Sequence, residues 1–176
     1  MPIIPNKEQT IGIFIDVQNL YHSAKNLYGG RVNFAELIKT LTGERKLVRA
    51  VGYVVKSTPE TGEESFFEAL QKSGIEVRSK DIQIFHSGAK KADWDVGMAV
   101  DAIRMSGMVD IVVLVTGDGD FVPLVEYLKW GLGRGVEVAA FGRTTSGRLK
   151  EMADRFIDLD TTPKMVFKSL KKSRAK

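Results

Sequence analysis

Residues 110–120 have the sequence DIVVLVTGDGD, in which an apolar run leads directly into an acidic turn. The run Asp110–Thr116 is almost entirely aliphatic, which is typical of a strand that is covered on both faces. Two glycines then let the backbone turn tightly, and Asp118 and Asp120 are displayed in that turn. Parallel sheets bind ligands at the carboxyl ends of their strands. This stretch therefore predicts a parallel sheet with an acidic site at its edge.

The other apolar segments of the chain alternate between strand and helix patterns. We predict strands or short extended segments at Thr10–Asp16, Leu47–Val55, Ile75–Ser79, Ile82–His86, Asp110–Thr116, Val136–Phe141 and Phe156–Leu159. We predict helices at Phe34–Leu41, Ser65–Lys72, Val96–Met105, Phe121–Trp130 and Ser146–Ala153. No bounded element is assigned to residues 17–33, which are polar and contain glycine. The alternation predicts an α/β fold in three layers, with a mostly parallel central sheet and helices on both faces.

Four aspartates are predicted to converge at one edge of this sheet. Asp16 ends the first strand, Asp118 and Asp120 follow the strand at 110–116, and Asp95 stands at the entry of a helix. The two strands are neighbours if the strand order reverses between them, as in doubly wound sheets. Several carboxylates in one partly buried place repel one another and lose hydration. A hard cation such as Mg²⁺ or Mn²⁺ removes this conflict, so we predict a metal site.

Two of the four acids also have a structural alternative. Asp120 is suited to cap the helix that follows it, and Asp95 is suited to cap its own helix. No structural role is evident for Asp16 or Asp118. Asn19 falls on the side of Asp16 if a helical turn starts there, where its amide would orient a water or a phosphate; otherwise it is a cap or turn residue.

Two further acids lie near Asp95 in sequence. Asp93 precedes it by two residues and is a possible additional ligand. Asp101 follows it by six residues, about 240° around a helix, so the two do not share a helix face. An aspartate in an otherwise apolar helix needs a partner, either the metal site or a structural cation such as Arg104.

Candidate RNA-binding residues follow predicted strand and loop ends. Trp94 is suited to stack on a base, and Ser146 opens a helix whose N–H groups suit a phosphate, although a plain N-cap is the alternative. The candidate cations are Lys56, Lys90, Lys91, Arg143 and Arg148.

The composition is that of an ordinary globular domain. The 176 residues are 43% hydrophobic and 27% charged and include no cysteine, which excludes disulfides and thiolate metal sites and fits a reducing cytoplasm. No apolar run approaches the ~20 residues needed to span a bilayer. We expect an N-terminal extension at 1–9, one domain at 10–160 and a basic tail at 161–176.

The basic tail accounts for the positive net charge. Six of the 26 basic residues lie in 161–176, and without them 20 basic residues face 22 acidic ones. Such a tail either attracts a polyanion or is a solvated terminus.

Four motifs together resemble the NYN domain, in particular its LabA-like branch. They are FIDVQN at 14–19, WDVGMAVDA at 94–102, VTGDGDF at 115–121 and FGRTTSGRLKEMADRFIDLD at 141–160. The resemblance covers residues 10–160 and implies a PIN-like fold with a Mg²⁺- or Mn²⁺-dependent ribonuclease site. It implies Asp16 as the first metal carboxylate with Asn19 beside it, Asp95 as the middle acid with Asp101 a possible contributor, and Asp118 and Asp120 as the final pair. Many relatives carry Lys-Gly where this chain has Lys90-Lys91, so Asp93 and Asp95 are alternative matches for the middle acid.

The resemblance implies a ribonuclease, and we expect it to act on single-stranded RNA in the cytoplasm, with no membrane association and with a homodimer left open. The alternative is a non-catalytic RNA-binding or regulatory module that retains the fold. A phosphoaspartyl hydrolase is disfavoured because Gln18 stands where its second Asp is needed, and no phosphate loop or dinucleotide fingerprint is present.

Overall fold

A single parallel sheet forms the centre of the protein. The computed structural model describes residues 3–56, 63–81, 83–88, 90–91 and 93–168, and within these ranges six strands have the order β4-β3-β1-β7-β8-β9. Every neighbouring pair is parallel, which confirms the predicted fold class. The strands are β1 (Thr10–Asp16), β3 (Lys46–Lys56), β4 (Glu76–Asp81), β7 (Ile111–Val115), β8 (Gly135–Ala140) and β9 (Arg155–Asp158).

The strand order reverses between β1 and β7. The chain progresses outward from β1 through β3 to β4 on one side, and from β7 through β8 to β9 on the other. The register pairs Ile15 with Val115, so Asp16 and Thr116 emerge together at the carboxyl edge of the two central strands. This is the switch point at which doubly wound sheets bind ligands.

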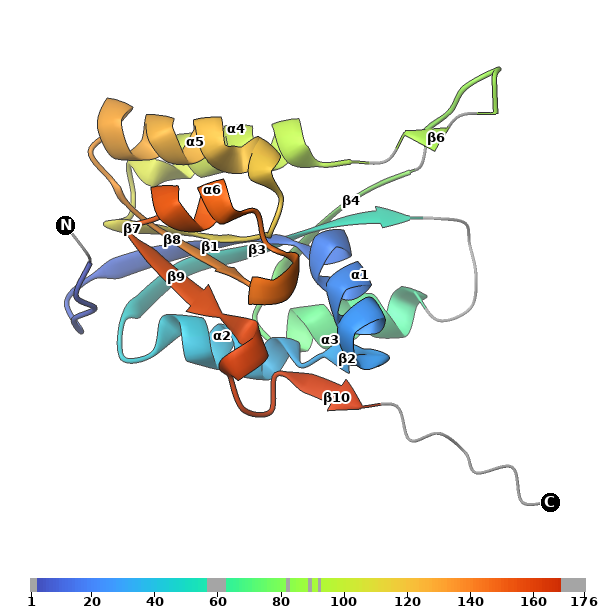
Figure 1. The fold of residues 1–176 in the computed structure, drawn as a ribbon, viewed down its shortest axis with the longest axis horizontal. Coiled ribbons are helices and arrows are strands. Elements are labelled where there is room, and N and C mark those ends of the chain that lie inside the picture. The colour runs from blue at the N-terminus through green and yellow to red at the C-terminus, as the bar shows by residue number, and fades with distance from the viewer. Residues whose placement is uncertain (1–2, 57–62, 82, 89, 92, 169–176) are drawn as a thin grey trace.

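Helices cover both faces of the sheet, as Figure 1 shows. One face carries α1 (Val17–Tyr28), α2 (Phe34–Thr42) and α3 (Glu63–Lys72), and the other carries α4 (Asp95–Ser106), α5 (Val122–Glu126) and α6 (Gly147–Met152). Successive residues of β1 point to opposite faces: Ile13 and Ile15 pack under the first layer and Phe14 under the second. Two covered faces explain why the strands are continuous apolar runs. No helix in these ranges is long and apolar enough to cross a membrane.

Two helical segments differ from the prediction. Helix α1 was not delineated, although its buried positions Val17, Leu20 and Ala24 follow the i, i+3, i+7 spacing of an amphipathic helix. The helix predicted at Phe121–Trp130 is instead a 3₁₀ turn, η1 (Gly119–Phe121), followed by α5 and by a π-helical turn, η2 (Tyr127–Gly131).

Two antiparallel strand pairs lie outside the main sheet. Strand β10 (Val166–Lys168) pairs with β2 (Gly30–Val32), and the neighbouring Met165 is buried, so this part of the basic segment packs on the body. Residues 169–176 lie outside the described residues. Strands β5 (Gln83–Ile84) and β6 (Lys90–Lys91) form a hairpin in the region of the extended segment expected at Ile82–His86, of which Ile82 is not described.

A charge is buried in the middle of the sheet. Glu137 of β8 has no exposed surface, and Arg45, which follows α2, is also buried. The guanidinium of Arg45 donates to both carboxylate oxygens of Glu137 at 2.8 and 3.0 Å, and Arg155 of β9 contacts the same carboxylate at 3.5 Å. The paired cation compensates the lost hydration of Glu137.

Candidate metal centre

Three of the predicted acids form a compact cluster. Asp95, Asp118 and Asp120 each offer one carboxylate oxygen, and these oxygens all lie within 4.8 Å of one another. Asp95 is the first residue of α4, whereas the other two lie in the turn after β7. Asp95 and Asp118 are half-buried and Asp120 is exposed. Oxygen ligands at this spacing suit a hard divalent cation.

A small pocket of about 160 Å³ at the switch point brings further predicted residues to the cluster. It is lined by Asp16, Gln18, Asn19, Tyr53, Asp93, Trp94, Asp95 and Asp118. Asp16, Asn19 and Asp93 are therefore placed beside the cluster, although they do not belong to the group of three oxygens.

Asp16 has a structural role that the sequence did not reveal. One of its carboxylate oxygens accepts a hydrogen bond from the backbone N–H of Asn19 at 3.1 Å, which caps α1. The other oxygen accepts from the Thr116 hydroxyl at 3.2 Å. Burial raises the pKa of Asp16 above its ordinary value, and these two hydrogen bonds oppose that effect. The carboxylate is thus held rigidly at the base of the pocket.

The side chain of Asn19 connects α1 to the acidic turn. Its amide oxygen accepts from the backbone N–H of Gly117 at 3.0 Å. This contact leaves the acidic turn attached to the helix that Asp16 caps. The predicted helical turn after Asp16 is confirmed, and the amide orients the backbone of the turn.

The expected capping role of Asp120 is wrong, because Asp118 performs it. A carboxylate oxygen of Asp118 accepts from the backbone N–H of Asp120 at 2.9 Å and so caps η1. The N–H of Asp118 in turn donates to the Thr116 hydroxyl at 3.2 Å. Helix α5 begins with no side-chain cap. Among the described residues no group is paired with the Asp120 carboxylate, which is therefore available to a ligand.

The two glycines of the acidic turn allow close packing of a neighbouring loop. A Cβ at Gly117 would meet the Thr145 hydroxyl at 3.0 Å, and one at Gly119 would meet the Ser146 hydroxyl at 2.9 Å. The N–H of Ser146 also donates to the carbonyl of Gly117 at 3.0 Å. The loop after β8, which contains the 3₁₀ turn η3 (Gly142–Thr144), is thus the outer wall of the turn.

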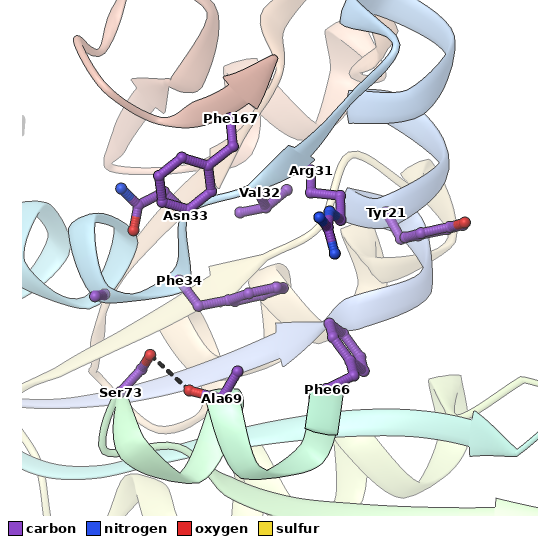
Figure 2. Close-up of a pocket in the computed structure, with 10 residues that line it drawn as sticks. Tyr21, Arg31, Val32, Asn33, Phe34, Phe66, Ala69, Ser73 and Phe167 are labelled. Carbon is purple, nitrogen blue, oxygen red and sulfur yellow. Dashed lines mark hydrogen bonds between the residues drawn. The ribbon is translucent and has the colours of Figure 1, made fainter. Parts of the chain in front are cut away.

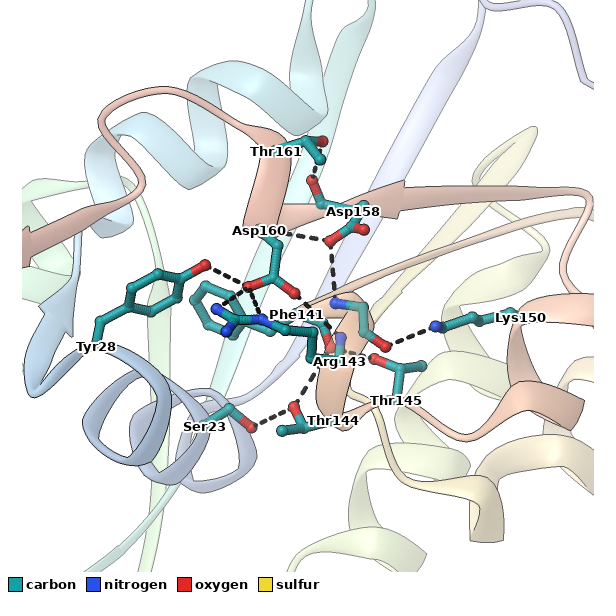
Figure 3. A network of polar contacts seen from close by, with 11 residues as sticks. Ser23, Tyr28, Phe141, Arg143, Thr144, Thr145, Lys150, Asp158, Asp160 and Thr161 are labelled. Carbon is teal, nitrogen blue, oxygen red and sulfur yellow. Dashed lines mark hydrogen bonds and ion pairs between the residues drawn. The ribbon is translucent and has the colours of Figure 1, made fainter.

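A polar network fixes this loop, as Figure 3 shows. The Asp160 carboxylate accepts from the Arg143 guanidinium at 3.0 Å and from the Tyr28 hydroxyl. Asp158 accepts from the N–H of Gly142 at 3.0 Å, and the Thr144 hydroxyl donates to Ser23 of α1 at 3.1 Å. Arg143, a predicted RNA contact, therefore has its charge paired with a neighbouring carboxylate.

Asp95 is a half-buried member of the cluster whose carboxylate has no partner among the described residues. Within the described part of the chain it accepts no hydrogen bond and forms no ion pair, and α4 has no side-chain cap. Its predicted capping role is thus wrong. Burial, and then the charges of Asp16, Asp118, Asp93 and Asp120, raise the pKa of Asp95 to about 6. This is the signature of a carboxylate that lacks a cation.

The raised pKa of Asp95 predicts a pH-dependent stability for the metal-free protein. The folded state binds the proton more tightly than the unfolded state, so this group's contribution to stability falls as pH rises from about 4 to about 6. Because Asp95 is substantially exposed, we expect a loss of only about 1 kcal/mol, or roughly 2–4 °C in Tm. Thermal melts with chelator at pH 4 and pH 8 measure it, and Asp95→Asn should remove this contribution. An unchanged pH dependence in the variant would contradict the assignment.

Asp101 lies apart from the cluster. Its carboxylate accepts from the Tyr53 hydroxyl at 2.8 Å and from the Arg78 guanidinium of β4. The predicted partner Arg104 is more distant, at 3.9 Å. Asp101 is therefore paired with a structural cation and does not join the candidate metal site, and this cation is mainly Arg78.

Trp94 is packed into the wall of the pocket. Its indole N–H donates to the carbonyl of Val54 at 2.9 Å, and its ring lies against Tyr53 and over Gly97. The Lys80 ammonium lies 5.0 Å from the ring centroid. These contacts give Trp94 a positioning role between β3 and α4.

The remaining predicted contacts lie around the rim. Ser146 caps α6 by accepting from the N–H of Leu149 at 3.4 Å, and a cap on so short a helix accounts for this residue. Arg148 is exposed on α6, which packs against η1. Lys56 lies 5.8 Å from the ring of Phe67. Lys90 and Lys91 belong to β6, which extends away from the sheet in Figure 1, and their side chains are outside the described part of the structure.

Thr116 and Tyr53 are functional-site residues that sequence reasoning missed. The Thr116 hydroxyl contacts both Asp16 and the N–H of Asp118, so it sets the spacing between the two central strands. The signal available in the sequence for Thr116 was that a polar residue ends the most apolar strand. The link from Tyr53 to Asp101 spans 48 residues and leaves no local signal.

A separate pocket of about 380 Å³ lies on the face of the sheet that carries the first three helices. It is formed between α1, β2, α2, α3 and β10 (Figure 2). Phe34, Phe66 and Phe167 form much of its wall, and no acidic side chain lines it. It is therefore independent of the candidate metal centre.

Comparisons with known proteins identify the family and the fold. The model of the NYN domain matches residues 10–160. The chain is 27% identical over 158 residues to the low amplitude and bright protein LabA of Synechococcus elongatus, covering 85% of this chain and 83% of that protein. The crystal structure of a protein of unknown function from Vibrio parahaemolyticus superimposes with a TM-score of 0.84 at 31% identity, covering 94% of this chain and 100% of that one.

Proposed function

Because this chain belongs to the NYN domain family, we propose that it is a metal-dependent ribonuclease that hydrolyses RNA phosphodiester bonds at its aspartate cluster. The observation that carries the proposal is the state of Asp95. This carboxylate lies near four other acids at the switch point and has no cation among the described residues to balance it. A structural acid would be paired, as Asp101 and Asp160 are.

The residues present fit a Mg²⁺ or Mn²⁺ ion. Asp95, Asp118 and Asp120 each offer a hard oxygen donor within 4.8 Å of the other two, and no softer ligand lines the pocket. Asp16 adds negative charge from the base of the pocket. When bound, such an ion would supply the Lewis acidity that activates a water and offsets the charge of the pentacovalent phosphate.

The protein's own contribution is to hold these acids in place. Thr116 joins the Asp16 carboxylate to the backbone of Asp118, and Asn19 holds the preceding Gly117. These hydrogen bonds fix the acidic turn against α1 before any ligand binds, so the site costs little reorganisation during the reaction. Arg148, exposed on α6 beside the turn, is placed to contact a phosphate next to the scissile one.

A cleavage assay tests the function. We expect labelled single-stranded RNA to be cut in Mn²⁺ or Mg²⁺, to stay intact in chelator, and to stay intact with Asp118→Asn. Asparagine can still accept the hydrogen bond from Asp120, so this variant keeps the cap and removes only the charge. Equal cleavage by both proteins would refute the site.

Two controls separate the alternatives. Single-stranded DNA of the same sequence reports whether the 2′-hydroxyl of RNA matters. If RNA binds tightly but is never cut in either metal, the non-catalytic RNA-binding module replaces the nuclease.

A further inference from the structure

Helix α4 carries an apolar stripe on its solvent side. Val96, Val100 and Ile103 are 76%, 47% and 36% exposed, respectively. At 100° per residue these three lie within about 60° of one another, opposite the residues Met98 and Ala102 that pack on the core. An amphipathic helix normally turns its apolar stripe inward. Here α4 is apolar on both its inner and its outer side.

A second exposed apolar group continues this layer. Trp130 and Tyr127, both in the π-helical turn η2, are 81% and 50% exposed. Helix α4 packs on β1 and β7, and η2 packs on β8, the next strand of the sheet. Both helical segments therefore lie in the layer that covers the same face of the sheet (Figure 1). We call Val96, Val100, Ile103, Tyr127 and Trp130 the outer helical face.

The outer helical face is larger than scattered surface residues would give. Aromatic side chains present 150–250 Å² each, and the exposed fractions of the five residues together leave on the order of 500 Å² of side chain in solvent. That is comparable to the largest apolar patch of a typical monomer and to more than half of what each partner contributes to a standard interface. The five side chains thus supply the apolar part of a standard dimer interface, and the polar residues around them would supply the remaining area.

We propose that the outer helical face is a homodimer interface in which α4 packs antiparallel against α4 of a second copy. The stripe is symmetric about Val100, so a two-fold axis there brings Val96 opposite Ile103 of the partner subunit and the reverse. Charges of opposite sign flank the stripe, Arg104 on α4 and Glu126 on α5. Glu126 forms no ion pair within the described ranges, so it is available to a cation of the partner subunit. A self-complementary patch favours a second copy over an unrelated partner.

This arrangement has a consequence for the metal centre. Asp95 directly precedes Val96, so antiparallel pairing places the aspartate clusters of the two subunits at opposite ends of the paired α4 helices. The interface leaves the acidic turn after β7 uncovered. The proposal stands on the exposed side chains and does not depend on the nuclease activity.

Sedimentation equilibrium tests the oligomeric state. We expect the protein to be dimeric at micromolar concentration and Val100→Glu to weaken dimerisation at least 100-fold, because two carboxylates would meet at the axis. Val48→Glu is the matched control, since Val48 is 41% exposed on β3 away from the outer helical face. Circular dichroism verifies that both variants fold. A monomeric wild-type protein, or equal dimerisation by both variants, would overturn the proposal.

Disulfide trapping tests the orientation, since the chain has no cysteine of its own. Val100→Cys should cross-link to itself on oxidation, whereas Val48→Cys should not. Val96→Cys alone should stay uncoupled, because its two copies would be about 11 Å apart along the helix axis, beyond disulfide reach. A mixture of Val96→Cys and Ile103→Cys should couple. Self-coupling of Val96→Cys would show parallel packing and overturn the antiparallel arrangement.

Discussion

Replacing Asp95 by Asn is expected to reduce metal-dependent RNA cleavage at least 100-fold while the protein becomes more stable without metal. Asp95 makes no hydrogen bond or ion pair with the described residues, so the fold loses nothing. The substitution also relieves the repulsion between Asp95 and the neighbouring acids, which contributes to raising the pKa of Asp95 to about 6. A group that destabilises the empty protein and is needed only with a ligand is typical of a functional site.

Two measurements on the same samples separate function from folding. The variant should melt about 2–4 °C above the wild-type protein at pH 8 in chelator. In Mn²⁺ the wild-type melting temperature should rise, and that of the variant should change little because one ligand is lost. Glu68→Gln serves as the control, since Glu68 is an exposed acid on α3 that does not line the pocket. Full activity of Asp95→Asn would remove Asp95 from the proposed mechanism.

Replacing Glu137 by Gln is expected to cause the largest loss of stability of the substitutions considered. Glu137 is fully buried, and the variant would leave the Arg45 guanidinium buried without its counter-charge. Breaking such a pair costs about 3–5 kcal/mol, which is roughly 10 °C or more in Tm for a chain of this size. Chemical denaturation at neutral pH measures the change.

An exposed ion pair provides the matched control. Glu76 pairs with Arg49, and both side chains are about half exposed, so Glu76→Gln should cost about 0–1 kcal/mol. The double variant Arg45→Met with Glu137→Leu should recover most of the lost stability, because an apolar pair needs no compensation. If the double variant is as unstable as Glu137→Gln, steric packing rather than charge explains the effect.

The strands and the position of the candidate site could be predicted because their signals are local. Asp110–Thr116 and Thr10–Asp16 are apolar runs whose length and composition indicate buried strands, and each ends near an aspartate. Parallel strands share a carboxyl edge, so the convergence of Asp16 and Asp118 follows from topology alone. The structure places both at one small pocket.

The roles of the individual acids could not be predicted because they depend on hydrogen bonds of the folded backbone. A capping role was expected for Asp120, and the structure gives it to Asp118. Asp16 had no evident structural role and proves to cap α1. Whether a carboxylate faces an N–H or a ligand is decided by a few degrees of backbone rotation in the turn.

The orientation of α4 also required the tertiary structure. The spacing of Val96, Val100 and Ile103 predicts a helix, and the helix is present, yet this stripe faces solvent. Met98, Ala102 and Met105 cover the sheet instead. A helix with two apolar sides has no local signal for which side is inward; the choice depends on the strands beneath it.

The sequence by itself determined the α/β class, the strands that end in acids and the existence of a candidate metal site, because hydrophobic periodicity and strand-end chemistry act over a few residues. Only the tertiary structure decided which acids are free, that Arg45 neutralises Glu137 across 92 residues, and which side of α4 is exposed. These properties depend on contacts between segments far apart in the chain, and the energies of such contacts arise only when the segments meet.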